Sequence, residues 1–148
     1  MRLTSTSFPD GGVIATRYGK RAENVSPQLS WEDVPDGTVS LLLTVTDLHP
    51  VARGYVHWVV ADIDPSVGGF DEGAAGALPS GRETTPYAGP FPPSGTHEYE
   101  FTLLALSGGA PRFDALPWGG DEESTDSIDD HILATARYSG HFTVAPLG

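Results

Sequence analysis

Three polar residues interrupt or end segments of the sequence that are otherwise apolar. Asp47 ends the run SLLLTVTD, His57 lies within GYVHWVVAD, and His97 opens HEYEFTLLAL. A buried carboxylate or imidazole needs a hydrogen-bonding partner, because burying it unpaired costs free energy. If the three segments are neighbouring strands, these side chains converge at one end of a sheet and form a polar pocket.

A stiff loop leads into His97. The segment GPFPPSG, residues 89–95, is built largely from proline and glycine. Prolines reduce the entropy that a loop loses when a ligand binds, and glycines let the backbone approach a ligand closely. Imidazole N–H groups and loop amides are donors to an anion. We therefore expect the loop and the histidines to bind a small anion, with His49 as an accessory donor. The simpler alternative is a rigid turn next to a solvent-exposed His97.

The same trio also suggests two other functions. Two histidines and one carboxylate are the ligand types of a metal site, but their spacing matches no specific metal motif, and we assign no metal and no cofactor. His57 or His97 beside Asp47 is also compatible with a general base in a small hydrolase or isomerase. No G-x-S-x-G elbow, phosphate-binding loop or dinucleotide fingerprint is present, so we assign no catalytic residue. A third interpretation is a protein-interaction or inhibitor module that acts through its surface loops.

Composition limits the partners. The net charge is −12, and the isoelectric point is near 4.5. Such a surface argues against nucleic-acid binding, which needs positive charge to displace counterions from phosphates. No apolar run is long enough to span a bilayer, no secretory signal begins the chain, and cysteine is absent. We expect an acidic, soluble, cytoplasmic protein.

The pattern of apolar residues predicts one mainly β domain over residues 1–148, with the form of an antiparallel β-sandwich and one or two short helices near the C-terminus. Strands are expected where apolar and branched residues lie between turn signals. In the second strand, strict alternation places Tyr55, His57 and Val59 on one face and Trp58 on the other. A helix is expected over Glu122–Ala136, capped by Asp121 or Ser124. The strand predictions cover Leu3–Phe8, Leu29–Trp31, Ser40–Asp47, Gly54–Asp62, His97–Leu106 and Arg137–Val144.

A series of motifs resembles the phosphatidylethanolamine-binding protein (PEBP) family, and in particular its compact prokaryotic branch, which is described as Raf-kinase-inhibitor-like. The matching segments, in order, are LTSTSFPDGGVIATRY, ENVSPQLSWEDVPDGTVSLLLTVTD, HWVVADI, YAGPFPPSGTHEYEFTLLAL and HILATARYSGHF. The resemblance implies a β-sandwich with a small pocket for phosphate-like groups, including phospholipid head groups. It implies Asp47, His57 and His97 as pocket residues, with Pro93 and Gly95 in the loop wall.

The resemblance leaves the biological role open. Eukaryotic relatives inhibit kinases or act as signalling adaptors, so a regulatory role with a protein partner is a further expectation. Some compact relatives form dimers, which leaves a homodimer open. The chain departs from the family where D-P-D-A-P is common and this sequence has Asp47-Leu48-His49-Pro50-Val51. Replacing the second acid by His49 makes the pocket less negative, which we expect to favour anions.

Overall fold

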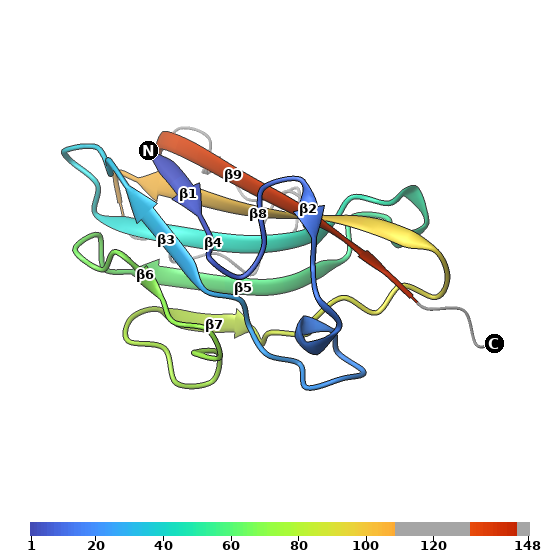
Figure 1. Cartoon of the computed structure of the whole chain (residues 1–148). Helices are drawn as coiled ribbons and strands as arrows, with labels where there is room; N and C mark the ends of the chain where they lie inside the picture. Colours follow the sequence, from blue (N-terminus) through green and yellow to red (C-terminus); the bar gives the residue numbers. More distant parts are fainter. Residues whose placement is uncertain (109–130, 145–148) are drawn as a thin grey trace.

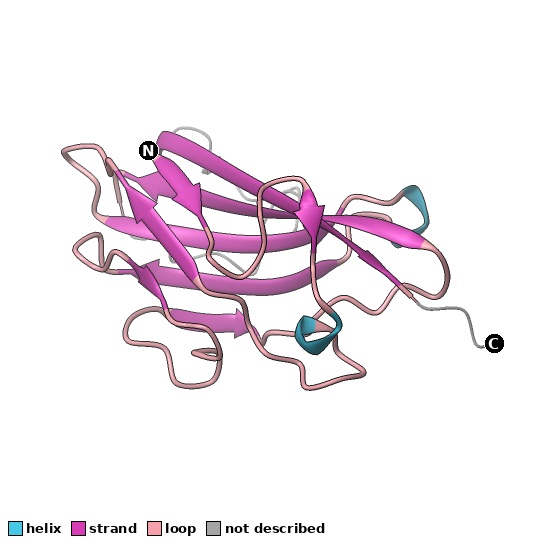
Figure 2. Cartoon of the chain, viewed as in Figure 1, coloured by secondary structure: helices cyan, strands magenta, loops and turns pink. Residues whose placement is uncertain are grey.

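The computed structural model describes residues 1–108 and 131–144 and consists of two β-sheets with two short 3-10 turns (Figures 1 and 2). One sheet has six strands in the order β2-β9-β8-β4-β5-β7, and the other has three in the order β1-β3-β6. The strands are β1 (Arg2–Thr4), β2 (Gly12–Val13), β3 (Leu29–Glu32), β4 (Ser40–Asp47), β5 (Val56–Ile63), β6 (Gly69–Phe70), β7 (Arg82–Thr85), β8 (Thr96–Leu106) and β9 (Ile132–Thr143). The turns are η1 (Thr16–Tyr18) and η2 (Pro50–Ala52).

The long strands of the six-stranded sheet follow the apolar runs of the sequence. β4 has the predicted bounds, and β5 and β8 lie within one or two residues of theirs. β4 pairs antiparallel with both β5 and β8, and β8 pairs antiparallel with β9. The expected neighbour relation of the three strands that carry Asp47, His57 and His97 is therefore present.

The main core draws its side chains from both sheets. Leu29, Trp31 and Phe70 come from the three-stranded sheet, whereas Leu43 and Trp58 come from β4 and β5 of the larger one. In Figure 1 the three-stranded sheet lies in front of the left half of the larger sheet. A second, smaller apolar cluster lies around Leu42, Val59 and Leu104, which alternate with core residues along their strands. The larger sheet is thus buried on both faces over its central strands.

The predicted C-terminal helix is wrong over its second part. Residues 132–136 belong to β9, while residues 122–130 of the prediction lie outside the described residues. Ile132 and Ala136 are spaced as on a helical face, but Ala136 and Tyr138 are buried, and Thr135 and Arg137 between and beside them are exposed. This alternation with a period of two is that of a strand, and eleven register pairs with β8 stabilise it.

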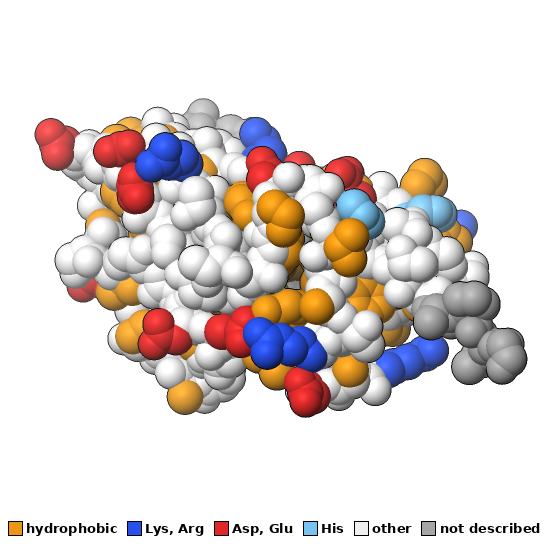
Figure 3. Space-filling view, in the orientation of Figure 1, with side chains coloured by type: hydrophobic (Ala, Val, Ile, Leu, Met, Phe, Trp, Pro, Cys, Tyr) orange, Lys and Arg blue, Asp and Glu red, His pale blue; other side chains and the backbone are white. Residues whose placement is uncertain are grey.

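Charged side chains are dispersed on the surface. On the face in Figure 3, basic side chains form separate points among acidic ones and no continuous basic surface. The ion pair Arg2–Glu32, at 2.6 Å, and the pair Arg82–Asp62, at 2.8 Å, neutralise two of the eight basic residues. Within the described part of the chain, no helix has the length and apolar character needed to cross a membrane.

Candidate functional site: a histidine and aspartate cluster at one end of the large sheet

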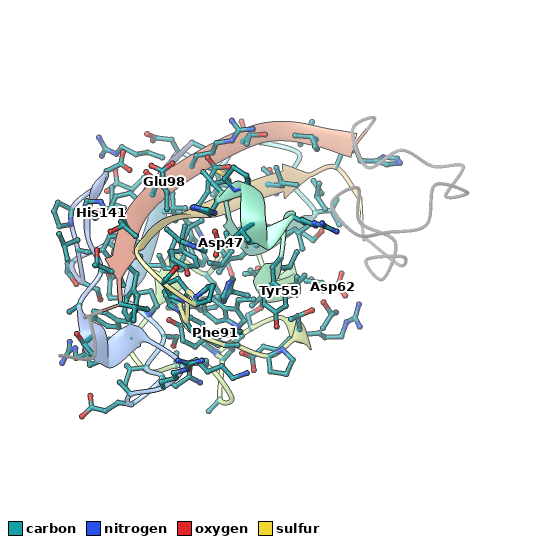
Figure 4. The ribbon with its side chains drawn as sticks, turned by 90° about the vertical axis from the view of Figure 1, so that its right-hand side faces the viewer. Asp47, Tyr55, Asp62, Phe91, Glu98 and His141 are labelled. Carbon is teal, nitrogen blue, oxygen red and sulfur yellow. The ribbon has the colours of Figure 1, made fainter. Side chains whose placement is uncertain are left out.

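Asp47, His57 and His97 lie at the same end of the six-stranded sheet because of the strand directions. Asp47 is the last residue of β4, whereas His57 and His97 lie near the starts of β5 and β8, which run antiparallel to β4. All three are buried, with 4%, 3% and 2% of their surfaces exposed. Figure 4 looks onto this end of the molecule, with Asp47 near its centre.

Asp47 holds two histidine-bearing segments through its two carboxylate oxygens. Its Oδ2 accepts a hydrogen bond of 2.7 Å from Nδ1 of His97, and its Oδ1 accepts one of 2.8 Å from the backbone N–H of His49. The backbone N–H of the next residue, Leu48, donates to the Glu98 carbonyl at 2.8 Å, which joins the same two segments again. Asp47 therefore orients His97 and shapes the turn that follows β4.

His57 is the extra residue of a β-bulge. Val45 pairs with Trp58 and Thr46 with Val56, so His57 has no register partner on β4. The alternation expected from the sequence is wrong here. Val56 packs with Val59 against the smaller cluster, while His57 contacts Tyr99 of the main core at a centroid distance of 5.1 Å. A bulge re-aims a side chain in this way, and here it turns His57 towards Asp47 and Tyr99.

The segment before the proline-rich loop fixes the His57 ring. Nδ1 of His57 donates to the Ala88 carbonyl at 2.7 Å, and the backbone N–H of Ala88 donates to the His57 carbonyl at 2.9 Å. Burial lowers the pKa of His57 below its ordinary value, and the Lys20 charge acts in the same direction. The Ala88 and Gly89 carbonyls and the Asp47 carboxylate oppose this shift. His57 is thus biased towards its neutral form.

His49 joins the cluster from the exposed side. Its ring stacks on that of His97, with centroids 4.0 Å apart and an interplanar angle of 9°. Its Nδ1 accepts a hydrogen bond of 3.1 Å from the Val51 N–H, which closes the η2 turn. The described residues contain no cis peptide bond, so Pro50 is trans. His49 therefore lies directly beside His97, and its role as an accessory donor stays a prediction.

The stiff loop approaches the cluster with only part of its length. Gly89 passes so close to η1 that an added Cβ would lie 1.9 Å from the Tyr18 carbonyl oxygen, and its N–H donates to Asn24 Oδ1 at 2.7 Å. Pro93 and Gly95 are exposed, and a Cβ on Gly95 would meet nothing within 4 Å. The loop contact with an imidazole comes instead from Phe91, whose ring centroid lies 5.5 Å from that of His57.

Four residues of the cluster were not predicted from the sequence. Tyr99 lies between the two buried histidines, with ring centroids 5.1 Å from His57 and 6.5 Å from His97. Tyr99 follows His97 by two residues in β8, so the two side chains share a face of the strand. This spacing could have predicted Tyr99 as a member of the cluster. Tyr55 and Phe91 form aromatic contacts with His57 and with each other, at 6.0 Å between their own centroids. The Lys20 ammonium lies 4.6 Å from the centre of the Phe91 ring and is the only lysine in the chain.

The Tyr99 hydroxyl is buried and forms no well-aligned hydrogen bond with any described residue. Burial raises the pKa of Tyr99 strongly, the nearby Asp47 carboxylate raises it further, and the Phe91 amide opposes the shift. The phenol therefore keeps its proton and remains a donor at the centre of the cluster. A buried polar group without a partner is uncommon and requires an explanation.

The described residues offer no comparable second site. No group of three or more His, Cys, Asp or Glu side chains within residues 1–108 and 131–144 is placed to hold a metal ion. A hollow of about 400 Å³ lies between β1 and β9, and Asp10 and Arg2 are among the residues that line it, whereas Asp47, His57 and His97 are not. Asp10 already accepts a hydrogen bond from the Ser139 N–H at 2.8 Å, and Arg2 is paired with Glu32. Among the described residues, the buried side-chain polar atom that lacks a hydrogen bond, the Tyr99 hydroxyl, lies in the histidine cluster and not in this hollow.

Comparison with known proteins identifies the family. The model of the phosphatidylethanolamine-binding protein family matches residues 4–143. The chain is 36% identical to a UPF0098 protein of Methanothermobacter thermautotrophicus, over 95% of this chain and 97% of that one. It is 33% identical to the UPF0098 protein YbhB of Escherichia coli, over 97% of this chain and all (100%) of that one. The crystal structure of a putative PEBP homolog, CT736 of Chlamydia trachomatis, covers 97% of each chain with a TM-score of 0.76 and 31% identity. The chain belongs to the phosphatidylethanolamine-binding protein family.

Proposed function

We propose that this protein binds a small molecule with a phosphate group, or a similar anion, at the cluster of Asp47, His57 and His97. The observation that carries the proposal is the arrangement of the two buried imidazoles. Each is held through Nδ1, by Ala88 or by Asp47, and no described residue forms a hydrogen bond with either Nε2 atom. Two fixed imidazoles with one nitrogen unused are suited to bind a small polar ligand.

The unpartnered Tyr99 hydroxyl supports the same proposal. A ligand oxygen would accept its hydrogen bond and remove the cost of leaving a buried donor unpaired. Lys20 adds a positive charge near His57 in a chain whose net charge is −12.

Aromatic and apolar side chains next to the cluster would contact the organic part of the ligand. Tyr55, 49% exposed, has its ring 4.9 Å from that of His57, and Phe91 lies at right angles to it. Leu48 and Val51, in the turn between β4 and β5, are also exposed. In Figure 4 Tyr55 and Phe91 lie on the same side of Asp47. We propose that the two sheets form a sandwich and that the ligand binds at the end of the larger sheet where the histidines lie.

A histidine NMR titration tests the proposal. Phosphoethanolamine is added to the ¹⁵N-labelled protein at about pH 6, where imidazoles titrate. Ring signals of His57 and His97 should shift together and saturate. His97→Asn should abolish this response, because the Asn amide can replace Nδ1 towards Asp47 but has no group in place of Nε2. His141→Gln is the matched control and should respond like the wild type. If neither buried histidine responds at millimolar ligand, the proposal is wrong.

A second candidate function rests on one observation, the 2.7 Å hydrogen bond between Asp47 and His97. A carboxylate that orients an imidazole is part of many hydrolytic sites, in which the imidazole acts as general base. Turnover of phosphate and carboxylic esters, with and without added divalent metal, tests it. Hydrolysis that is lost in Asp47→Asn would support an enzyme, and binding without turnover would leave the first proposal.

A further inference from the structure

The protons on the two buried histidines follow from their hydrogen-bond partners. The Ala88 carbonyl and the Asp47 carboxylate can only accept hydrogen bonds. Nδ1 of His57 and Nδ1 of His97 must therefore carry protons. When either ring is neutral, its Nε2 has no proton and is an acceptor. The simple expectation that neutral imidazoles in this cluster donate to an anion is thus incorrect for both buried rings.

His49 has the opposite tautomer. Its Nδ1 accepts the Val51 N–H, so the proton of a neutral His49 ring is on Nε2. His49 is exposed, however, and it lies on the outer side of His97. The cluster therefore presents two acceptors, the Nε2 atoms of the neutral His57 and His97 rings, and two donors, the Tyr99 hydroxyl and Nε2 of a neutral His49 ring.

A phosphate dianion does not match two acceptors. The phosphate oxygens and the unprotonated Nε2 atoms are all hydrogen-bond acceptors, and their lone pairs would repel. A hydrogen bond between an oxygen and an Nε2 atom therefore requires one proton, carried by either atom. A monoester can bring this proton itself, because its second pKa lies near 6. A diester has no such proton at neutral pH, and both protons would have to be placed on the histidines.

The charged and titratable neighbours determine how easily a ring can take this proton. The Asp47 carboxylate favours a proton on His57, whereas burial of the ring and the Lys20 charge oppose it. The His49 and His97 rings stack with centroids 4.0 Å apart, so two positive charges on them would repel each other. Tyr99 remains neutral and contributes no charge. Two added protons within the imidazoles alone are therefore costly, and one shared with a phosphate oxygen is less so.

We infer that the cluster binds phosphate monoesters together with at least one proton and discriminates against phosphodiesters. This inference rests on the proposed function. It narrows the ligand class to molecules with a terminal phosphate, such as a phosphorylated amine, alcohol or sugar. A head group embedded in an intact phospholipid is a diester and is disfavoured.

Two calorimetric comparisons test the inference. Phosphoethanolamine is titrated into the wild-type protein at about pH 8 in two buffers with different ionisation enthalpies, which yields the number of protons bound. The ligand is then replaced by glycerophosphoethanolamine, a diester with the same amine. We expect uptake of about one proton or more, and affinity for the monoester that falls about tenfold per pH unit from pH 7 to 9. The diester should bind about tenfold more weakly or worse, because it brings no proton that an imidazole Nε2 atom could accept.

The outcomes separate this inference from the function on which it rests. If phosphoethanolamine binds with no proton uptake, or if both ligands bind equally, the inference is wrong and phosphate binding stands. If neither ligand binds between pH 6 and 8, the proposed function itself fails. His141→Gln should show the wild-type uptake, which excludes a general effect of removing a histidine.

Discussion

The buried His57 should make the protein less stable as the pH falls, and the structure determines the sign. Burial lowers the pKa of His57 in the folded state, so the unfolded chain binds a proton at a higher pH than the folded protein. Above the ordinary pKa of about 6.5, both states are neutral at this residue and the effect is absent. Below it, the unfolded state gains protons first, and the free energy of unfolding decreases as pH decreases.

The size of the effect on the free energy of unfolding follows from the one extra proton that the unfolded chain binds at residue 57. Between the unfolded and folded pKa values, the loss approaches about 1.4 kcal/mol per pH unit. His57→Asn removes the titration and keeps a donor towards the Ala88 carbonyl. The variant should be less stable than the wild type at pH 7.5, because it leaves space in the core. This stability difference should shrink as the pH falls from about 6.5 towards 5.

Urea unfolding at a series of pH values measures this effect. The free energy of unfolding of His57→Asn is subtracted from that of the wild type at each pH. This difference isolates the titration of His57, because the contributions of unchanged groups cancel. His141→Gln is the control, since it removes a histidine that lies away from Asp47 in Figure 4, and it should keep the wild-type pH slope. A His57→Asn variant with the same slope as the wild type would refute the reasoning.

Three further predictions concern single residues. Gly89→Ala should lower the free energy of unfolding by about 1–3 kcal/mol or more in urea titrations, because the new Cβ would lie 1.9 Å from the Tyr18 carbonyl oxygen. Wild-type stability would contradict the close approach. Tyr99→Phe should leave stability unchanged or raise it by up to about 1 kcal/mol, yet weaken phosphoethanolamine binding, because the hydroxyl has no well-aligned hydrogen-bonding partner among the described residues. A large loss of stability would reveal such a partner. His49→Asp should weaken phosphate binding about tenfold in calorimetry by adding a negative charge beside His97. An unchanged or stronger affinity would show that having His49 in place of the acid of the family motif does not favour anions.

The strands that carry the cluster could be predicted from the sequence because their apolar runs are long and lie between turn signals. β4 is the clearest case, with both ends predicted correctly. β2, β6 and β7 were not predicted, since two have only two residues and β7, RETT, has no apolar residue. The helix expected at residues 132–136 failed because Ile132 and Ala136 fit a helical spacing by coincidence, whereas pairing with β8 selects a strand.

The convergence of Asp47, His57 and His97 could be predicted from strand ends alone, but the orientation of the rings could not. It depends on the bulge at His57 and on the hydrogen bonds to Ala88 and Asp47, which no local pattern reveals. Lys20 reaches the cluster from a distant segment and becomes visible only in the folded chain. The ligand-binding roles of Pro93 and Gly95 stay predictions, and both residues are exposed in the structure.

The most direct test of the central claim is a crystal structure of the protein with phosphoethanolamine at saturating concentration. The account predicts a phosphate group within hydrogen-bond distance of Nε2 of both His57 and His97, with a phosphate oxygen accepting from the Tyr99 hydroxyl. A phosphate found only in the hollow between β1 and β9, or a histidine cluster that stays empty at saturation, would contradict it.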